Sequence, residues 1–579
     1  MSVVVPVTEF IADEGYPGTP PEALHAPFVV EPFGRFTAAD EQRFWFLDFH
    51  WPRGLTPMGM IWNQDGYSWG TQLAAAQLPL PRGHGITQRL AGTHTYASAI
   101  AVESPHEIRA RGERLRAYLP RFLNDFDGFW QRRLDEIEGG WQHLSRTDTA
   151  TASLTELTAM LREARTFHRR SFEIHFEVMY PLLALYLGFR GLCSELGIDP
   201  ADVARFLDPG DTLIMQTDRE LWRLTAAARG AGLESLFART EPERLAAELS
   251  AAGGSASGWC ARFSDFLAAR GHRTEGTCDI ALPSWVEDPT PALGLIKTFL
   301  QQGTEHDFDA AAGAAAQRRD EAIDAARSRL TRSEQNTFDA ALASMQAVNF
   351  ARWQDDHNVS IDLRVALPMR WAALAIAERV GADRRDDTLF LFWPELLAVA
   401  DGERDYGGFR SLVQARRQYF EHWHERRASM PKVLGTIPDT VDDPILIEIF
   451  GLNRQFLAAV EATGRGGRLT TLSGIGAASG RARGIARVLS DADALHRLLP
   501  GEVLVCESTS PNWTPAFAKI AACVCDGGGT LSHAAIVGRE YGVPTVTACG
   551  TATLQIRDGD EVEVDGDLGT VHILGRPGG

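Results

Sequence analysis

The sequence predicts a multidomain α+β protein, with a large, mainly α-helical region followed by a compact C-terminal α/β domain. The chain has 579 residues, which is too long for a single hydrophobic core. Residues 104–460 repeat apolar side chains at steps of three and four, as amphipathic helices do. Beyond a glycine- and arginine-rich stretch, short β-like runs alternate with helical ones up to residue 579.

These changes in residue pattern divide the chain into four predicted segments. Residues 1–103 form a Pro- and Gly-rich N-terminal arm and an aromatic-rich part, and residues 104–460 form the helical domain. Residues 461–473 are a Gly-rich hinge linker. Residues 474–579 form the α/β domain, which has the size of one ordinary domain. Its expected strands lie at 484–489, 502–506, 521–525, 545–547, 561–566 and 570–574.

Composition excludes several classes of protein. A net charge of −19, spread along the chain without a basic block, argues against nucleic acid or an anionic membrane as the main partner. The longest nearly apolar stretch, 178–189, is shorter than the roughly 18 residues of a membrane span, and the N-terminus lacks the basic region of a signal peptide. Seven scattered cysteines, with Cys523 and Cys525 too close for an ordinary metal knuckle, predict a reduced cytoplasmic protein without a metal site.

A histidine follows a glycine loop near the end of the chain. Gly527–Gly529 come directly after an apolar strand, and Ser532 and His533 open a helical run. Glycines allow close approach to a bulky anion, and the first N–H groups of a helix point at it. A histidine there can attack phosphorus and hold a phosphoryl group covalently. The alternative interpretation is a helix N-cap beside a surface histidine.

This stretch resembles a known signature. Residues 528–544, GGTLSHAAIVGREYGVP, resemble the phosphohistidine motif of the swivelling domain in phosphoenolpyruvate-utilising enzymes and dikinases, and residues 509–515, TSPNWTP, resemble that domain's Thr-Ser-Pro segment. Gly538 stands where many relatives have alanine, a departure that we expect to be harmless. The resemblance implies that His533 is the phosphocarrier. The residues it implies for phosphate binding are Gly528, Gly529, Thr530, Ser532 and Arg539, although Arg539 could equally form a structural salt bridge.

A second resemblance lies in the helical region. Residues 271–280, GHRTEGTCDI, and 283–289, PSWVEDP, are similar to a segment shared by rifamycin phosphotransferases and phenol-phosphorylating synthases, where a helical acceptor domain precedes the swivelling domain. Relatives are expected to have a glutamate where Thr277 stands. We find no glycine-rich lysine loop and no enolate-handling barrel after His533. We therefore expect ATP and Mg²⁺ to bind a separate ATP-grasp partner subunit.

One helical stretch offers candidate catalytic groups. Arg352, Asp356 and His357 fall within eight residues, and the first two share a helix face. Arg352 could stabilise charge on a migrating phosphoryl group. His357 or Asp356 could deprotonate an acceptor hydroxyl. The competing interpretation is a solvated polar helix with an internal ion pair.

Other residues are candidates for acceptor binding. His272 and Arg273 follow a glycine at a loop, although Arg273 could instead form a structural pair with Asp279. His168 and His175 share one helical stripe with aromatic residues, which could line a pocket but is more often core. Trp51 belongs to an aromatic cluster that could border the same pocket, and such clusters usually reflect packing.

These inferences predict a subunit of an ATP-dependent dikinase. The partner would phosphorylate His533 and release AMP and phosphate, and the swivelling domain would carry the phosphoryl group to a small phenol such as phenol or 4-hydroxyacetophenone. Two alternatives stay open. One is an antibiotic phosphotransferase of the rifamycin type, and the other is a non-enzymatic phosphocarrier or regulatory module.

Overall fold

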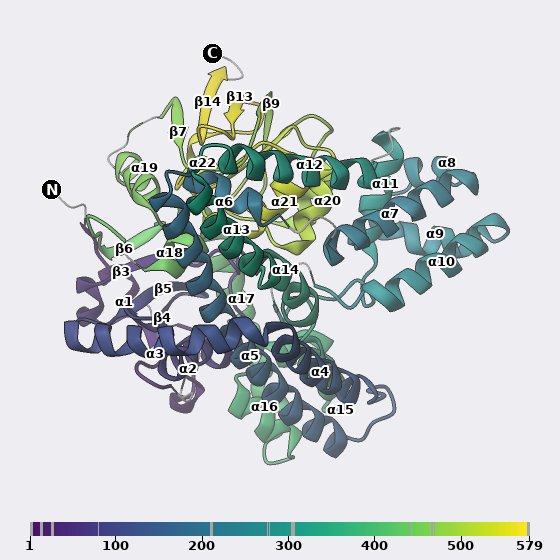
Figure 1. Cartoon of the computed structure of the whole chain (residues 1–579). Coiled ribbons are helices and arrows are strands. Elements are labelled where there is room, and N and C mark those ends of the chain that lie inside the picture. The colour runs from purple at the N-terminus through teal and green to yellow at the C-terminus, as the bar shows by residue number, and fades with distance from the viewer. Residues whose placement is uncertain are drawn as a thin grey trace. The chain divides into compact units, whose positions relative to one another are not determined.

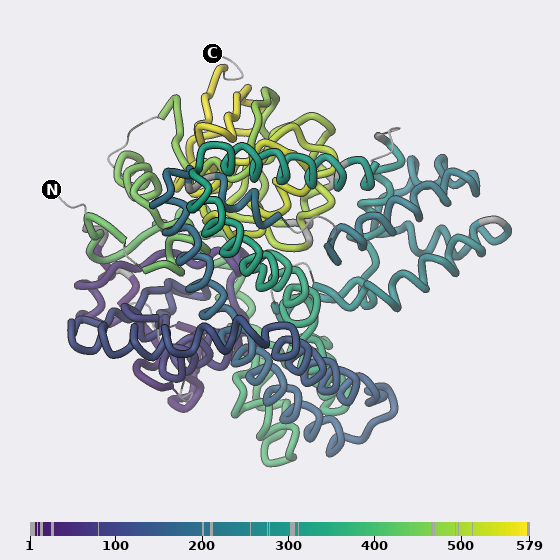
Figure 2. The backbone as a smooth tube through the Cα atoms, viewed as in Figure 1, coloured from purple at the N-terminus to yellow at the C-terminus, as the bar shows by residue number. Residues whose placement is uncertain are grey.

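The computed structural model has two compact units, each assembled from separate stretches of chain (Figure 1). It describes all residues except 1–3, 12–14, 25–27, 79, 209–211, 275, 277, 303–306, 442, 465–466, 468 and 576–579. Unit 1 comprises 1–185, 276–282 and 360–443, and unit 2 comprises 186–275, 283–359 and 444–579. Along the sequence, the polypeptide passes back and forth between the two units (Figure 2). The units are therefore not the linear segments of the sequence prediction, whose boundaries stay a prediction.

Unit 1 contains a six-stranded sheet and a group of helices. The sheet has the order β1-β6-β3-β5-β4-β2. Its strands are β1 (Val4–Val5), β2 (Gly34–Arg35), β3 (Phe44–Leu47), β4 (Gly83–Ala91), β5 (His94–Ala101) and β6 (Val433–Thr436). The helices are α1 (Thr8–Ile11), α2 (Trp69–Gln77), α3 (Pro105–Asn124), α4 (Phe126–Ser145), most of α5 (Leu154–Glu195), α15 (Leu367–Arg379), α16 (Trp393–Ala400) and α17 (Arg410–Arg426). A π-helix spans Trp62–Ser68.

One face of the long helix α5 is buried in the core of unit 1. Leu157, Leu161 and Ala164, spaced at three and four residues, are fully buried in one cluster with Ala373 and Ile376 of α15. One 18-residue window of α5 is apolar enough to cross a membrane by length and composition, but 56% of it is buried inside the protein. Core helices of globular proteins pass the same test.

Unit 2 combines helices with an eight-stranded sheet of order β7-β14-β13-β9-β10-β11-β12-β8. The strands are β7 (Thr471–Ser473), β8 (Ile475–Ala478), β9 (Arg481–Val488), β10 (Val503–Cys506), β11 (Ala522–Cys525), β12 (Thr545–Thr547), β13 (Glu561–Asp565) and β14 (Thr570–Gly575). Strands β9 to β12 are parallel neighbours, and the flanking pairs are antiparallel. The six predicted strands are present, and β7 and β8 are additional.

The helices of unit 2 come from three parts of the chain. They are α6 (Pro200–Phe206), α7 (Leu213–Gly230), α8 (Glu234–Arg239), α9 (Pro242–Ala252), α10 (Ser255–Arg270), α11 (Thr290–Gln302), α12 (Phe308–Arg327), α13 (Arg332–Ala347), α14 (Phe350–His357), α18 (Pro444–Glu448), α19 (Arg454–Gly464), α20 (Thr514–Phe517), α21 (His533–Tyr541) and α22 (Ala552–Gln555). The predicted α+β class is therefore confirmed. The predicted hinge at 461–473 coincides with the end of α19 and with β7, and its residues 465, 466 and 468 lie outside the described part.

Alternation along the strands separates the core of unit 2 into two layers. Val503 and Val505 of β10 face one buried cluster, whereas Leu504 and Cys506 face the other. Helix α21 contributes Ala534, Val537 and Tyr541 to the second cluster. Because one face of this helix is fixed against the sheet, the start of α21 has a defined position relative to the strands.

Gly538 packs more closely than the sequence suggested. A Cβ at this position would lie 2.3 Å from Oγ1 of Thr545, whose hydroxyl donates to the Val543 carbonyl. We expect Gly538→Ala to lower the free energy of unfolding by about 1–3 kcal/mol, since a buried methyl group would force its neighbours apart. Gly258→Ala is the control, because Gly258 is a helical glycine with open space around it.

Urea unfolding of both variants measures this difference. Combining Gly538→Ala with Thr545→Ala should recover part of the loss, because the closest atom is then gone. Equal stability of Gly538→Ala and Gly258→Ala would show that alanine is tolerated.

Candidate active site

His533 is the first residue of α21, and Ser532 is its N-cap. Its side chain is partly buried. Its Nδ1 lies 2.8 Å from the hydroxyl oxygen of Thr509, and its Nε2 lies 3.1 Å from that of Thr514. Thr509 lies in the loop that follows β10, and Thr514 is the first residue of α20. Two hydroxyl groups therefore hold the imidazole ring, one at each nitrogen.

The hydrogen bonds of Thr514 assign the protons of the ring. The single hydroxyl hydrogen of Thr514 is donated to the Pro511 carbonyl at 2.8 Å. Toward His533 this hydroxyl must therefore accept, so Nε2 carries the proton. Nδ1 is then the bare nitrogen, and Thr509 donates to it. Nδ1 becomes available to attack phosphorus only when the Thr509 hydroxyl moves away, and Nε2 only when it has given up its proton.

The electrostatic surroundings keep the ring neutral. Burial, and then the charge of Arg273, lower the pKa of His533 to about 3. Arg273 is 3% exposed, donates to the Pro511 carbonyl at 3.1 Å, and stacks its guanidinium 4.4 Å from the centre of the Trp285 ring. A neutral imidazole has a lone pair for nucleophilic attack, and a fixed cation beside it favours an approaching phosphoryl group.

Backbone groups fill the space that the glycines leave. The N–H of Gly528 donates to the Phe450 carbonyl at 2.8 Å, and that of Gly529 to the Ile449 carbonyl at 2.9 Å. A Cβ on Gly529 would lie 2.1 Å from the carbonyl oxygen of Glu448. In this conformation the missing side chains of the glycines therefore leave room for the backbone at the end of α18 and just after it. Their predicted role in phosphate binding stays a prediction, and it requires that this backbone withdraw.

The polar residues of the loop are also engaged. The Thr530 hydroxyl donates to the Glu448 carboxylate at 2.6 Å, and Arg190 forms an ion pair with the same carboxylate. The Ser532 hydroxyl donates to the Gly529 carbonyl. Arg539 donates to the carbonyls of Ala477 and Thr530, at 3.0 and 3.2 Å. Through these two hydrogen bonds Arg539 links α21 to β8 and to the glycine loop that precedes α21.

The candidate catalytic residues of the helical region lie on α14, also in unit 2. None of the His533 contacts described above involves them. Arg352 is exposed and lines an open groove with Arg319 and Arg327. His357 is buried and stacks on Trp353, with ring centres 4.5 Å apart. The assignment of Arg352, Asp356 and His357 as catalytic residues stays a prediction.

Three of the predicted acceptor-binding residues come together in unit 1. Trp51 contacts Trp62 with ring centres 4.1 Å apart, and Trp62 contacts Phe172 at 5.1 Å. His168 and His175 flank Phe172 on α5, at 5.0 and 5.9 Å. Burial lowers the pKa of His168 to about 4, so this histidine is neutral. The result is an aromatic cluster that contains the neutral His168.

The remaining two candidates follow α10 in unit 2. His272 is partly buried, and Arg273 is the residue whose charge acts on His533. Thr277, where relatives are expected to have glutamate, lies outside the described residues. Sequence reasoning did not assign Thr509, Thr514 or Glu448 to the site. The Thr-Ser-Pro resemblance contains the first two, and could have identified them.

Removing the Thr509 hydroxyl should slow phosphorylation of His533. We expect Thr509→Val to be about 10-fold slower, because one hydrogen bond that orients the ring is worth about 0.5–1.5 kcal/mol. Thr509→Ser keeps the hydroxyl and is the control. Phosphohistidine formation in a rapid-quench assay measures the rate. Equal rates for the valine and serine variants would show that the hydroxyl does not orient the ring.

Comparisons with known proteins agree with this geometry. The family described as PEP-utilising enzyme, mobile domain, matches residues 498–569. The family described as rifampicin phosphotransferase fourth domain matches residues 174–353. The first match contains both threonines and His533. The second contains Arg273 and Arg352, and it ends before Asp356 and His357.

Whole-chain comparisons find relatives that are longer than this chain. Chondramide synthase of Chondromyces crocatus is 31% identical over 559 residues, which are 92% of this chain and 14% of that protein. The uncharacterized phosphotransferase YvkC of Bacillus subtilis (strain 168) is 28% identical over 75% of this chain and 50% of that protein. Prodigiosin synthesizing transferase PigC of Serratia marcescens is 28% identical over 60% and 37%. The chain spans half or less of the length of these relatives.

Two parts of this chain therefore resemble known families. Residues 498–569, which contain His533, match the mobile domain of PEP-utilising enzymes, and residues 174–353 match the fourth domain of rifampicin phosphotransferase.

Proposed function

We propose that this chain is the phosphohistidine and acceptor-binding part of an ATP-dependent dikinase that phosphorylates a small phenol. A separate ATP-grasp subunit, using ATP and Mg²⁺, supplies the phosphoryl group to His533 and releases AMP and phosphate. The mobile domain then delivers the group to a phenol of the phenol or 4-hydroxyacetophenone type. The observation that carries the proposal is the neutral His533, held by two threonines beside the buried Arg273.

The proposed reaction has two phosphoryl-transfer steps. In the first, an imidazole nitrogen attacks phosphorus, the bond from phosphorus to the donor oxygen breaks, and the proton of the ring passes to the leaving oxygen. In the second, the acceptor oxygen attacks phosphorus, the N–P bond breaks, and the proton of the acceptor hydroxyl returns to the imidazole ring. A phenol ionises near pH 10, well below an alcohol, so modest help from a base is enough for it.

The aromatic cluster of unit 1 supports an aromatic acceptor. Trp51, Trp62 and Phe172 offer ring faces, and His168 offers a neutral polar group for a hydroxyl. The match of residues 174–353 to rifampicin phosphotransferase favours a second candidate, an antibiotic of the rifamycin type as acceptor. A non-enzymatic carrier is the third.

Chemical phosphorylation separates the acceptor question from the donor question. Phosphoramidate, a small reagent that phosphorylates imidazole, would charge His533 without ATP, and the charged chain is then offered phenol, 4-hydroxyacetophenone or rifampicin. Mass spectrometry and ³¹P NMR follow the products, and uncharged His533→Asn protein is the control.

The outcomes are distinct. An aryl phosphate from a simple phenol supports the proposal, whereas phosphorylated rifampicin alone supports the antibiotic enzyme. A phosphohistidine that survives every acceptor supports the carrier. In a separate assay, release of AMP from ATP by this chain alone would contradict the separate nucleotide subunit.

A further inference from the structure

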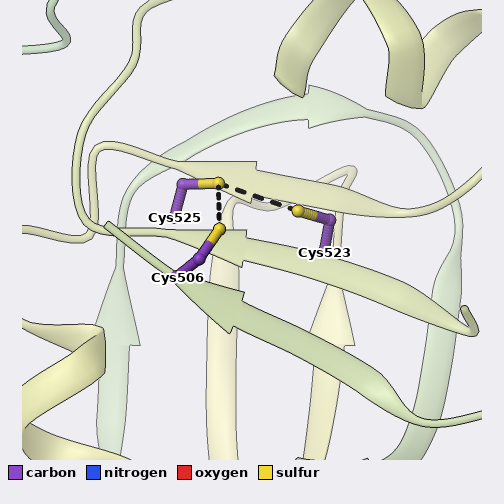
Figure 3. A group of neighbouring side chains, drawn as sticks. All are labelled: Cys506, Cys523 and Cys525. Carbon is purple, nitrogen blue, oxygen red and sulfur yellow. Dashed lines mark hydrogen bonds between the residues drawn. The ribbon is translucent and has the colours of Figure 1, made fainter. Parts of the chain in front are cut away.

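Three cysteine side chains meet on one face of the eight-stranded sheet of unit 2. Cys506 is the last residue of β10, and Cys523 and Cys525 lie on the neighbouring strand β11. The Sγ atoms of Cys506 and Cys525 are 3.6 Å apart, and those of Cys523 and Cys525 are 3.7 Å apart (Figure 3). All three residues are buried, with at most 1% exposure. The three sulfur atoms therefore form one cluster that water does not reach.

The strand register brings these residues together. Cys506 is the ladder partner of Cys525 across a parallel pair, so both side chains leave the same face. Cys523 precedes Cys525 by two residues and therefore points to that face as well. The surrounding core cluster is apolar and includes Phe517 and Val537. Sulfur is therefore the ligand atom that these three side chains offer to a metal ion.

The separations suit a shared ion better than a disulfide. A disulfide requires an S–S bond of about 2.05 Å and Cβ atoms about 3.8 Å apart, whereas partners on neighbouring strands are about 4.8 Å apart with parallel side chains. Three sulfurs spaced evenly around one ion, each bound at about 2.3 Å, lie about 4.0 Å from one another. The observed 3.6 and 3.7 Å are within a few tenths of an ångström of that value, and all three sulfurs lie within 4.8 Å of one another.

We propose that Cys506, Cys523 and Cys525 form a binding site for a soft, thiophilic metal ion of the copper(I) class. Soft ions favour thiolate sulfur, whereas Mg²⁺ and Ca²⁺ require oxygen ligands. Structural Zn²⁺ takes four ligands, and this cluster supplies three. Copper(I) displaces one thiol proton for its one positive charge, so the apolar core gains no net charge and no electron is transferred.

The site lies beneath the phosphocarrier loops. Cys506 is followed closely by Thr509, and Cys525 by Gly527–Gly529 and then His533. An ion held by all three sulfur atoms would fasten the ends of β10 and β11 to each other, at the base of both loops. Because metal binding to the folded state adds to folding stability, occupancy should raise the unfolding temperature of this domain. This site does not depend on which acceptor the enzyme uses.

Anaerobic competition with a chromophoric chelator tests the site on the reduced full-length chain. The copper(I) complex of bicinchoninate is titrated with native protein, and with protein refolded in its presence, because a buried site could load only during folding. We expect one ion per chain, and Cys525→Ala should weaken binding by at least about 100-fold. Cys549→Ala is the matched control. Cys549 is also buried and its N–H donates to the Cys525 carbonyl, but its side chain belongs to the other core cluster.

The proposal fails on any of three results. These are no tight copper(I) binding by native or refolded protein, equal affinity in Cys525→Ala and wild-type protein, and loss of binding in Cys549→Ala alone. X-ray absorption of the copper-loaded wild-type chain keeps the test decisive if Cys525→Ala does not fold. Three sulfur neighbours at one distance support the site, and two sulfurs, or nitrogen or oxygen neighbours, contradict it.

Discussion

Replacing His533 with asparagine should abolish phosphoryl transfer, with a loss of about 10⁴-fold or more, the scale on which enzymes lose rate when a covalent nucleophile is removed. The reason is that in the proposed mechanism His533 is the residue to which the phosphoryl group becomes bonded, so its neighbours cannot take over its role. Acid-labile ³²P retained on the chain, and product formed from it, are the two measurements. Transfer at the wild-type rate by His533→Asn would refute the phosphohistidine mechanism.

Stability measurements show whether His533→Asn loses phosphoryl transfer because the nucleophile is missing or because the protein unfolds. The structure shows the His533 side chain partly buried with both nitrogens hydrogen bonded. Asparagine keeps polar atoms near Thr509 and Thr514, so we expect the domain to fold. The folded pKa of about 3 lies below the unfolded value, so the wild-type chain loses stability as the pH falls from about 6.5 to about 3, by at most about 1.4 kcal/mol per unit. The variant should lack this contribution.

Local patterns predicted the carrier domain well. The strand before Asp526, the glycine loop and the helix that begins at His533 are all encoded within one short segment, where glycine conformation, helix capping and strand alternation act on near neighbours. The αL residue Gly542, with φ of 66°, ends α21 in the same local way. Strands β7 (Thr-Leu-Ser) and β8 (Ile-Gly-Ala-Ala) contain one β-branched residue each, whereas the equally short β12 is β-branched throughout, so composition identified β12 and not the other two.

Long-range contacts decided what sequence could not predict. Glu448 reaches Thr530 because the chain after α18 packs against the glycine loop, and no spacing rule connects the two. The cysteine cluster was missed for the same reason. Cys523 and Cys525 were visible as a pair, but the third member, Cys506, joins them only through the register of β10 and β11. In contrast, His168 and His175 were predicted together because they share one helix.

Arg273 is the residue outside the mobile domain whose replacement should have the largest effect. We expect Arg273→Met to slow phosphorylation of His533 by about 10²–10³-fold, since a buried cation that stabilises transition-state charge is worth that much. Its charge also lowers the pKa of His533. Removing it should raise that pKa from about 3, while the remaining burial keeps it below the ordinary value.

Methionine keeps an apolar side chain at this position, so the change removes mainly the guanidinium, with its charge, its hydrogen bonding and its stacking on Trp285. Arg270→Met is the matched control, because Arg270 ends α10 three residues earlier and pairs with Glu220 rather than with the site. Rapid-quench phosphorylation gives the rate, and NMR titration of the His533 ring gives the pKa. A purely structural arginine would lower stability in Arg273→Met but leave the ring pKa where it is in Arg270→Met. A raised pKa together with slow phosphorylation in a folded protein shows instead that the guanidinium charge acts on the histidine, because only a charge within electrostatic range moves both quantities.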